Sequence, residues 1–305
     1  MRDVIIAGGG PAGISALIWC SRLGLDAVLL ERSGQLGGQL ARVYNAIIDY
    51  PGLWAENGRE LQEKLTQHVN QLGCSVQYDS EIERIQLADK RVITKHGEYQ
   101  AKMLILCTGA NDRRLGVPGE KEMIERGELY SVARDKSRFA GKQVAVIGGG
   151  DRAFEGALLL AEHGAAVTLV HRSKEFRARM EFVQLAKKHP QIQIITNTMV
   201  MRIHDNTRVQ SIELYSAEAG KKWTLPAHAV FVRIGIQPAN YLIREQVKTD
   251  EDGYIIVDDF GETSVSGVFA GGDLCTRPLF SSITSSVYQG MRAARSISYR
   301  INNKE

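Results

Sequence analysis

Three glycines near the N-terminus have the spacing of a phosphate-binding turn. Gly8, Gly10 and Gly13 follow a short apolar segment, and Pro11 suits the first turn of a helix that comes next. In such a turn the first glycine permits the bend, the second lets the backbone approach a pyrophosphate, and the third lets the helix pack on the strand. Glu31, at the end of the next apolar segment, would accept hydrogen bonds from an adenosine ribose. Together these residues predict a dinucleotide site.

The same pattern returns in the middle of the chain with a different ending. Gly148, Gly150 and Ala153 form a second turn, but the next apolar segment ends in His171-Arg172 instead of an acid. A cation there suits a 2′-phosphate, which favours NADPH over NADH, and Arg177 is a second candidate phosphate contact. Two such turns indicate two dinucleotides face to face, as hydride transfer from a nicotinamide to a flavin requires. The alternative is a solvated basic surface of Arg172, Lys174, Arg177 and Arg179.

Each turn needs a strand before it and a helix after it, and the sequence supplies both. Residues 3–7 and 27–31 are expected to be buried strands around a helix at 14–23. Residues 143–147 and 166–171 are expected to be strands around a helix at 154–163. Elsewhere we expect a helix capped by Asn57, strands at 254–257 and 267–270, and a final helix at 285–301.

This repeat predicts an α/β protein with two Rossmann-like, three-layer ββα dinucleotide-binding domains, the second inserted in the first. We expect the first, discontinuous domain to comprise residues 1–116 and 247–305. The inserted domain is then expected to cover residues 117–246.

Composition and charge exclude several other classes of protein. The chain has 305 residues, enough for two cores, with 44% hydrophobic and 24% charged residues, as in ordinary globular proteins. A net charge of +3 does not suggest nucleic-acid binding, and no apolar run is long enough to cross a bilayer. The first residues do not resemble a signal peptide, so we expect a cytoplasmic protein. The cysteines form no Cys-x-x-Cys pair and no metal-ligand spacing appears, so no metal is expected.

Beyond the first turn, further motifs resemble those of the low-molecular-weight thioredoxin reductases and the thioredoxin-reductase-like ferredoxin–NADP⁺ reductases, over essentially the whole chain. The motifs are Gly37-Gly38-Gln39-Leu40, Asp49 with Tyr50-Pro51-Gly52, Cys107-Thr108-Gly109-Ala110, 234–238, 267–273 and Ser282-Ile283-Thr284. The resemblance implies FAD in the first domain, NAD(P)H in the second, and a homodimer. The FAD residues that it implies are Gly8, Gly10, Pro11, Ala12, Gly13, Glu31, Arg32, Gly38, Gln39, Leu40, Asp49, Thr108, Gly109, Gly272, Asp273, Ser282 and Ile283. For NADPH or a second nucleotide they are Gly148, Gly150, Asp151, Arg152, Ala153, His171, Arg172, Arg177 and Gly235.

The chain departs from this family where thioredoxin reductases carry Cys-x-x-Cys-Asp. Residues 131–135 read Ser-Val-Ala-Arg-Asp, so both thiols of the pair are replaced. Residues 135–142 and Gly150-Asp151 resemble the ferredoxin–NADP⁺ reductase branch, which also lacks the pair. That branch has a C-terminal extension, whereas this sequence ends at Glu305, and its 37–40 region follows the thioredoxin reductase form. The sequence therefore fits neither branch fully.

The second nucleotide site also departs from the family pattern. Ser173 replaces one phosphate-binding arginine, Arg152 occupies the place of a small hydroxyl residue, and Arg233 lies within an apolar segment. Arg152 could clamp a pyrophosphate or crowd NADPH out. A second flavin in the inserted domain is therefore one alternative, as in relatives described as diflavin proteins.

Two further residues are candidates for a catalytic role. Cys275, close after Asp273, could form a charge-transfer or disulfide couple with the flavin or simply be packed in the core. Asp135 could act as a general acid, or it could be a helix cap or a surface acid. Cys20 and Cys107 are expected to be core residues.

The sequence predicts an FAD-dependent oxidoreductase that passes electrons between NAD(P)H, with NADPH favoured, and an external acceptor without a Cys-x-x-Cys pair. The acceptor is expected to be a small molecule or a small redox protein, with ferredoxin among the candidates. The alternatives are a ferredoxin or flavodoxin–NADP⁺ reductase, a diflavin or non-catalytic flavin-binding relative, and a disulfide reductase that uses Cys275.

Overall fold

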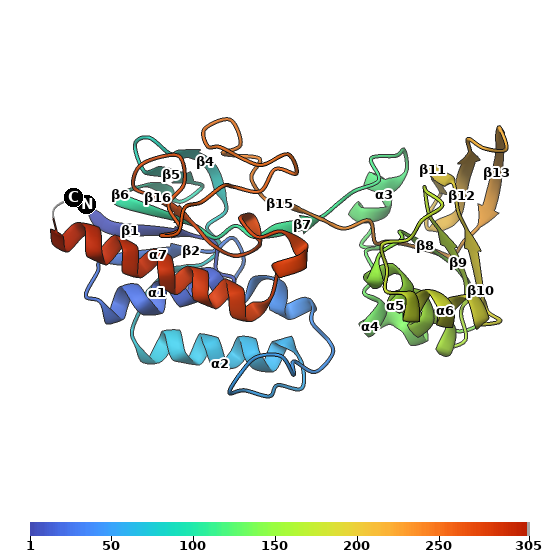
Figure 1. The fold of residues 1–305 in the computed structure, drawn as a ribbon, viewed down its shortest axis with the longest axis horizontal. Helices are drawn as coiled ribbons and strands as arrows, with labels where there is room; N and C mark the ends of the chain where they lie inside the picture. Colours follow the sequence, from blue (N-terminus) through green and yellow to red (C-terminus); the bar gives the residue numbers. More distant parts are fainter. Residues whose placement is uncertain (304–305) are drawn as a thin grey trace. The chain divides into compact units, whose positions relative to one another are not determined.

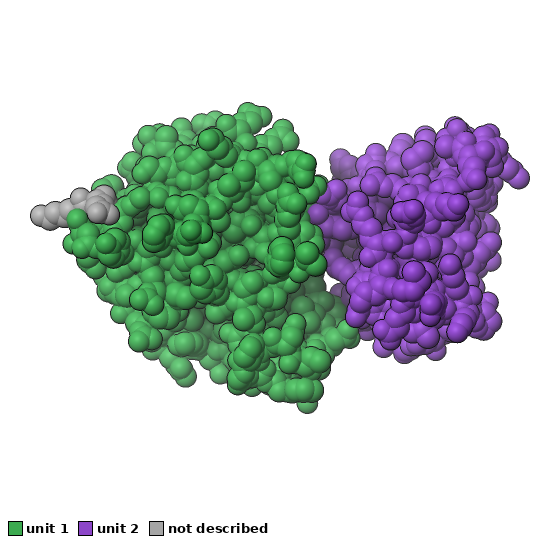
Figure 2. Space-filling view, viewed as in Figure 1, with its two compact units in different colours: residues 1–111, 237–305 green, residues 112–236 purple. Residues whose placement is uncertain are grey.

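A computed structural model describes residues 1–303 of the chain. It contains two compact units, one formed by residues 1–111 and the chain from 237 on, the other by residues 112–236 (Figure 2). The second unit is therefore inserted in the first, as the repeat predicted. The two units are described separately below.

The first unit is built on a seven-stranded sheet in the order β3-β2-β1-β6-β5-β4, with β16 also paired to β6 (Figure 1). β1, β2, β3, β16 and the second half of β6 are parallel, whereas β5 and β4 extend the sheet antiparallel from the first half of β6. Its strands are β1 Arg2–Ala7, β2 Ala27–Leu30, β3 Ser75–Gln77, β4 Ile82–Gln86, β5 Arg91–Thr94, β6 Gly97–Leu106 and β16 Val268–Ala270. Its helices are α1 Pro11–Arg22, α2 Gly58–Gln71 and α7 Ile283–Asn303, with 3₁₀ turns η1 Gly38–Arg42, η3 Gly272–Leu274 and η4 Pro278–Phe280.

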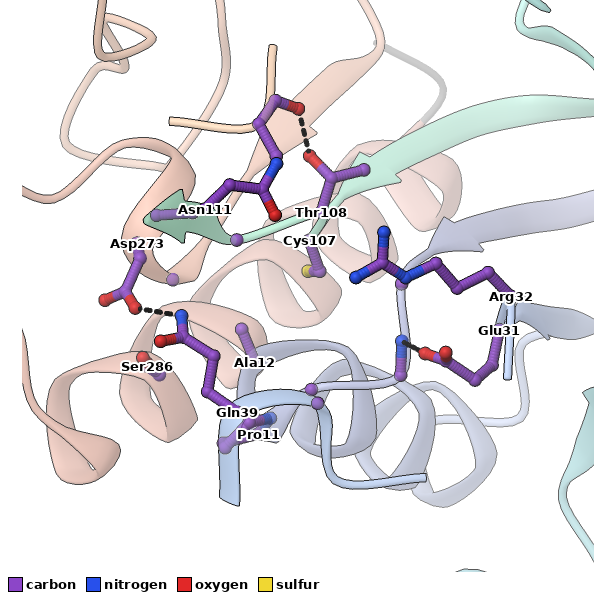
Figure 3. A pocket seen from close by; sticks show the side chains of 18 of the residues that line it. Pro11, Ala12, Glu31, Arg32, Gln39, Cys107, Thr108, Asn111, Asp273 and Ser286 are labelled. Carbon is purple, nitrogen blue, oxygen red and sulfur yellow. Dashed lines mark hydrogen bonds between the residues drawn. The ribbon is translucent and has the colours of Figure 1, made fainter. Parts of the chain in front are cut away.

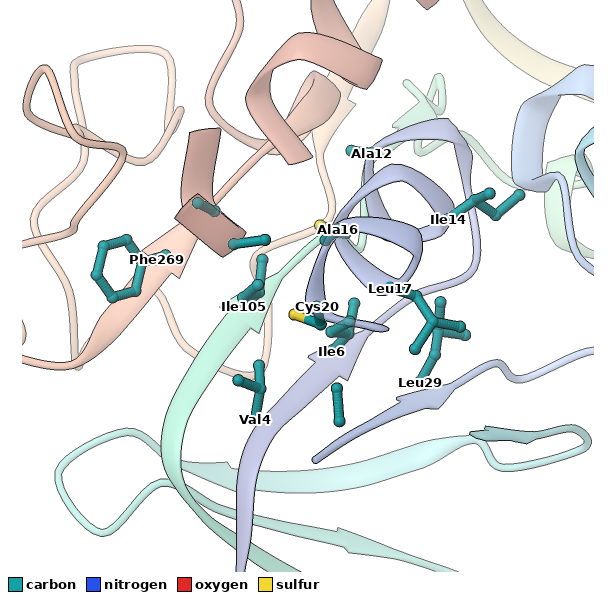
Figure 4. Close-up of a cluster of buried hydrophobic side chains, with 14 of the residues drawn as sticks. Val4, Ile6, Ala12, Ile14, Ala16, Leu17, Cys20, Leu29, Ile105 and Phe269 are labelled. Carbon is teal, nitrogen blue, oxygen red and sulfur yellow. The ribbon is translucent and has the colours of Figure 1, made fainter. Parts of the chain in front are cut away.

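Helices cover one face of this sheet, where α1 and α7 lie side by side (Figure 1). Their apolar side chains pack with Ile6, Ile105 and Phe269 of the sheet in one buried cluster (Figure 4). The two helices touch through backbone, because a Cβ added at Gly290 would lie 2.0 Å from the Ala12 carbonyl oxygen. A second cluster on the other face includes side chains of β4, β5 and the segment around Ile243 and Ile255. These layers are the expected three-layer arrangement.

The second unit repeats this plan. Its parallel sheet has the order β10-β9-β8-β14, and an antiparallel sheet β11-β12-β13 accompanies it. Its strands are β8 Gln143–Ile147, β9 Ala166–Val170, β10 Ile192–Ile195, β11 Thr198–Asp205, β12 Val209–Ser216, β13 Lys221–Pro226 and β14 Ala229–Val232. Its helices are α3 Glu120–Glu125, α4 Val132–Asp135, α5 Asp151–Glu162 and α6 Met180–Lys188, with the 3₁₀ turn η2 Lys136–Phe139. The β8-α5-β9 segment thus matches β1-α1-β2, which confirms the predicted repeat.

The chain passes between the units at 111/112 and 236/237, not at the expected 116/117 and 246/247. Two short strands, β7 Ala110–Asp112 and β15 Ile236–Pro238, pair at these crossings. The segment after β15 belongs to the first unit because the Ala239 N–H donates to the Gly109 carbonyl and the Ile243 side chain is buried in the first unit's core. The apolar pattern of residues 237–246 is too short for its periodicity to show to which domain the segment belongs.

Two local predictions differ in outcome. The Asn57 side chain caps α2, since its Oδ1 accepts hydrogen bonds from the N–H groups of Arg59 (3.0 Å) and Glu60 (3.1 Å). The predicted strand at 254–257 is wrong, because Ile255 makes only an isolated bridge to Thr249. Across residues 1–303, none of the helices combines the length and the hydropathy that a membrane span requires.

Candidate functional site

The turn after β1 gives each of its three glycines a distinct structural role. Gly8 has φ +106°, and a Cβ there would lie 2.4 Å from the Cys107 carbonyl oxygen. A Cβ on Gly13 would lie 1.9 Å from the Gly8 carbonyl oxygen, so α1 packs directly against the end of β1. Gly10, in contrast, has no heavy atom within 4 Å of its Cβ position. Its backbone is therefore open to a ligand at the N-terminus of α1, as a pyrophosphate requires.

Glu31 is held in place beside this turn at the end of β2. Its carboxylate accepts hydrogen bonds from the Gly9 N–H (2.8 Å), the Ser33 N–H (2.9 Å) and the Ser33 hydroxyl (2.8 Å), and the residue is only 6% exposed. Two carboxylate oxygens offer about four acceptor positions, so about one remains for a ribose hydroxyl. The fixed orientation supports the role predicted for this acid.

A cavity of about 520 Å³ lies over the turn, at the carboxyl ends of β1 and β6 where the strand order reverses (Figure 3). This volume lies within the usual range of cofactor pockets, roughly 300–1,000 Å³. Fifteen of the seventeen predicted FAD residues line the cavity: Gly8, Gly10, Pro11, Ala12, Glu31, Arg32, Gly38, Gln39, Leu40, Thr108, Gly109, Gly272, Asp273, Ser282 and Ile283.

The two other predicted FAD residues are not on the cavity wall. Gly13 lies beneath the turn, where it serves the packing of α1. Asp49 is exposed on the surface and does not line the cavity. The reason is local, since Ile47 pairs with Ala55 and the residues between them form an outward loop.

Asp273 is fixed at the other end of the cavity by two side chains, one of them from the distant η1 turn. The Gln39 amide donates to its Oδ2 at 2.8 Å (Figure 3), and the Ser281 hydroxyl donates to its Oδ1 at 2.5 Å. The preceding Gly272 has φ +78°, and its N–H donates to the Gln289 side chain of α7. The η1 loop, η3 and α7 thereby hold one carboxylate in a defined orientation toward the cavity.

Part of the cavity wall was not predicted. Ser80, Glu81 and Ile82 enter it from the start of β4, and Tyr241, Leu242 and Ile243 from the segment after β15. A third group, Arg42 and Val43, follows from η1. The only sequence signal for these residues is an apolar run at 241–243, which identifies burial but not the cavity that it borders.

The second turn follows the pattern of the first, although it accommodates an alanine, Ala153, at its third position. Gly148 has φ +149°, and its Cβ position lies 2.2 Å from the Arg233 carbonyl oxygen. Gly150 has no heavy atom within 4 Å of its Cβ position, and Ala153, in the first turn of α5, is fully buried. Gly235, predicted for the same site, has φ +96° and open space around its Cβ position. The open face of Gly150 again leaves room for a phosphate group.

His171 takes the place that Glu31 has in the first unit. A Cβ on Gly149 would lie 2.3–2.5 Å from its ring atoms, and its Nε2 lies 2.9 Å from the Ser173 hydroxyl. Burial, with repulsion from Arg172 and Arg177, lowers the pKa of His171. The imidazole is therefore neutral at neutral pH.

The basic residues of this unit are available to an anion. The Arg172 and Arg177 side chains are exposed and, within residues 1–303, neither lies within ion-pair distance of a carboxylate. Asp151 instead accepts from the backbone N–H (2.7 Å) and side chain (3.1 Å) of Arg179. The second unit thus contains the predicted turn, His171 and two arginines that form no ion pair within residues 1–303.

The segment that replaces the Cys-x-x-Cys-Asp motif is a single helical turn, α4. The Ser131 N–H donates to the Asp135 carboxylate at 2.9 Å, and Arg134 forms an ion pair with the same group at 2.7 Å. Burial by itself would raise the pKa of Asp135, but the hydrogen bonds from Arg134 and Ser131 hold it below its ordinary value. An ionised, hydrogen-bonded carboxylate favours the helix-cap interpretation over a general acid.

The described cysteines are all free thiols in the first unit. Cys20 and Cys107 are buried in its core, as predicted, and burial raises the pKa of both, to about 12 for Cys20. Cys275 is half-buried behind the cavity wall, and its Sγ lies 3.5 Å from the Gly272 carbonyl oxygen. Burial raises its pKa to about 11.

This pKa predicts a slow, strongly pH-dependent modification of Cys275. The raised pKa leaves about 10⁻⁴ of the group as thiolate at pH 7, so alkylation should be about 100-fold slower than for an ordinary thiol and rise about tenfold per pH unit. Mass spectrometry of iodoacetamide-treated protein at pH 7, 8 and 9 measures this rate. The Cys275→Ser variant identifies the modified peptide, and a rate at pH 7 equal to that of free cysteine would contradict the prediction.

Comparison with known proteins agrees with this geometry. Residues 2–294 match the family model described as "Pyridine nucleotide-disulphide oxidoreductase". The thioredoxin reductase of Bacillus subtilis (strain 168) is 34% identical over 301 residues, 98% of this chain and 94% of that protein. A 34.2 kDa protein in the rubredoxin operon of Clostridium pasteurianum is 32% identical over 294 residues, 96% of this chain and 94% of that protein. The crystal structure of Lactococcus lactis thioredoxin reductase in its FR conformation has a TM-score of 0.85 and 34% identity, with 100% of each chain covered.

The chain therefore belongs to the pyridine nucleotide-disulphide oxidoreductase family, and within it to the low-molecular-weight thioredoxin-reductase-like proteins. It is an FAD-dependent NAD(P)H oxidoreductase, and the cofactors of this family are FAD and NADPH. The sequence resemblance and the predicted fold class are thereby confirmed.

Proposed function

We propose that this protein transfers electrons from NADPH through FAD to an acceptor outside the chain, without a thiol pair of its own. The observation that carries the proposal is the combination of a complete cofactor cavity with Ser131 and Arg134 at the positions of the two family thiols. When bound, FAD supplies hydride acceptance from the nicotinamide and electron release to the acceptor. No protein nucleophile is required for that chemistry.

The first unit's residues would bind and orient FAD. The N–H groups around Gly10, at the positive end of α1, would hold the pyrophosphate, and Glu31 would hold the adenosine ribose. Asp273, already oriented by Gln39 and Ser281, would bind the ribityl and pyrophosphate side. Ile283, the first residue of α7, and Ser282 just before it would place backbone N–H groups at the pyrimidine edge of the flavin.

The second unit's residues would bind NADPH. Gly148, Gly150 and α5 would receive the pyrophosphate, while Arg172 and Arg177, both exposed and unpaired within residues 1–303, would receive the 2′-phosphate. Neutral His171 would pack against the turn and set its shape.

A small redox protein is the acceptor that the relatives favour. Several are thioredoxin reductases, and one is described as a protein in a rubredoxin operon. A small redox protein can meet a flavin directly, so it needs no thiol pair on this chain, and ferredoxin stays among the candidates. A homodimer and a cytoplasmic location stay predictions from the resemblance.

Anaerobic mixing of the purified protein with NADPH tests the proposal. We expect one FAD released per chain and loss of the oxidised flavin's visible absorption within seconds of mixing. Candidate acceptors, added next, should restore the absorption. Protein that stays colourless with excess FAD would overturn the flavin assignment, and unchanged absorption with both NADPH and NADH would overturn the donor assignment. Two flavins per chain would instead support the diflavin alternative.

A further inference from the structure

Two arginines meet at the second nucleotide turn, at a place where the family pattern has no cation. The strand order of the second unit reverses between β8 and β14, so the carboxyl ends of these two strands border the ligand position. Arg233 follows β14, and its N–H donates to the Ile147 carbonyl at the end of β8 (2.7 Å). Arg152 is the second residue of α5, directly after the turn.

Arg233 is a half-buried cation without a carboxylate. Its guanidinium donates to the carbonyl oxygens of Val232 (2.9 Å) and Tyr130 (3.2 Å), which use two of its five N–H donors. Within residues 1–303 its side chain forms no ion pair, although Asp112 lies near enough to act on it. Burial first, and then repulsion from Arg152, lowers the pKa of Arg233. Such a placement is costly unless an anion joins it.

Arg152 is also unfavourably placed for the protein alone. It lies in the first turn of α5, where the helix dipole is positive and a cation is destabilising. Its side chain is 61% exposed and forms a 3.3 Å ion pair with Asp112. Asp151, the adjacent acid, is already engaged by Arg179. Arg152 on the first turn of α5 and Arg233, whose carbonyl oxygen lies 2.2 Å from the Cβ position of Gly148, thus place two cations at this turn.

We propose that Arg152 and Arg233 form a clamp for the pyrophosphate of the nicotinamide dinucleotide. The proposal rests on the proposed function, and it decides between the two roles that the sequence left open for Arg152. A pyrophosphate carries two negative charges, and each guanidinium can donate two N–H groups to phosphate oxygens. On binding, Arg152 releases its 3.3 Å contact with Asp112 and donates to a phosphate oxygen instead. The Arg233 guanidinium, already held by two backbone carbonyls, donates its remaining N–H groups to the pyrophosphate.

The clamp residues affect the affinity for any nicotinamide dinucleotide, whereas other residues set the preference for NADPH over NADH. The pyrophosphate is common to NADPH and NADH, so Arg152 and Arg233 contribute equally to the binding of both. The 2′-phosphate is present only in NADPH, so selectivity resides in Arg172 and Arg177 at the end of β9. Variants of the two groups should therefore have different effects on a set of nucleotides.

Isothermal titration calorimetry on the FAD-loaded protein tests this with NADP⁺, NAD⁺ and adenosine 2′-monophosphate. Arg152→Gln should weaken NADP⁺ and NAD⁺ by the same factor, about ten- to a hundred-fold, and leave adenosine 2′-monophosphate unchanged. Arg233→Lys keeps the charge but loses the planar fork, and should weaken both dinucleotides about tenfold. Arg177→Gln, the matched control, should weaken NADP⁺ and adenosine 2′-monophosphate and spare NAD⁺. Flavin absorption and melting temperature show that each variant is folded.

The remaining outcomes separate the clamp from the proposed function. If Arg152→Gln binds NADP⁺ as tightly as the unaltered protein or more tightly, Arg152 crowds the turn and the clamp is wrong, while the donor assignment stands. If Arg152→Gln weakens adenosine 2′-monophosphate as well, Arg152 is a 2′-phosphate contact and the clamp is also wrong. If the unaltered protein binds none of the three nucleotides, both the clamp and the NADPH assignment fail.

Discussion

Replacing Gly13 by alanine is expected to yield protein that neither retains FAD nor folds with normal stability. The new Cβ would lie 1.9 Å from the Gly8 carbonyl oxygen, which is backbone and cannot rotate away. α1 must then move off the end of β1, and overpacking of this kind costs about 3 kcal/mol of unfolding free energy. The displaced turn loses its N–H geometry, so we expect FAD affinity to fall at least about 100-fold. Urea unfolding and flavin absorption after gel filtration measure the two effects.

Gly10→Ala is the matched control within the same turn. Gly10 has no heavy atom within 4 Å of its Cβ position and a φ of −74°, which alanine adopts freely. Its unfolding free energy should change by less than about 0.5 kcal/mol, whereas FAD should bind more weakly because the methyl group enters the cofactor space. A Gly13→Ala protein that is yellow and as stable as the Gly10→Ala protein would contradict the interpretation of both positions.

The second large effect concerns disulfide substrates, which this protein should not reduce. With NADPH and oxidised thioredoxin, NADPH consumption is expected to stay at least about a thousand-fold below consumption with a flavin-oxidising dye. Exchange needs a thiolate, and the half-buried Cys275 thiol, whose pKa is raised to about 11, supplies very little at pH 7. A single thiol also cannot release the mixed disulfide, a step that in the family falls to the second cysteine of the pair.

The dye reaction is the control, because it shows that the flavin of the same preparation turns over. Cys275→Ser should leave the dye rate unchanged, since no thiol takes part. Thioredoxin turnover comparable to the dye rate would contradict the prediction. If that turnover disappeared in Cys275→Ser, Cys275 would be the thiol used, and the protein would be a disulfide reductase after all.

The local parts of both nucleotide sites were predictable because they depend on short stretches of chain. The turn at Gly8–Gly13, the acid at Glu31 and the equivalent turn at Gly148–Ala153 lie within single strand-helix-strand units, where residue type and spacing fix the backbone. The cap at Asn57 followed from the same local logic, since its side chain bonds N–H groups two and three residues on. Asp49 does not line the cavity, and a resembling motif does not report which side of a loop faces it.

Residue types and their spacing were therefore enough to predict two repeated dinucleotide-binding units and to show that the chain has no Cys-x-x-Cys pair. The three-dimensional fold was needed to show which distant segments complete the cavity, such as Tyr241–Ile243 and Ser80–Ile82, and where the chain crosses between units. It also showed that Arg233 lies beside the Gly148–Ala153 turn, although Arg233 comes 81 residues after Arg152 of that turn. The physical reason is that an apolar pattern marks a residue as buried but does not specify which remote segment it packs or pairs with.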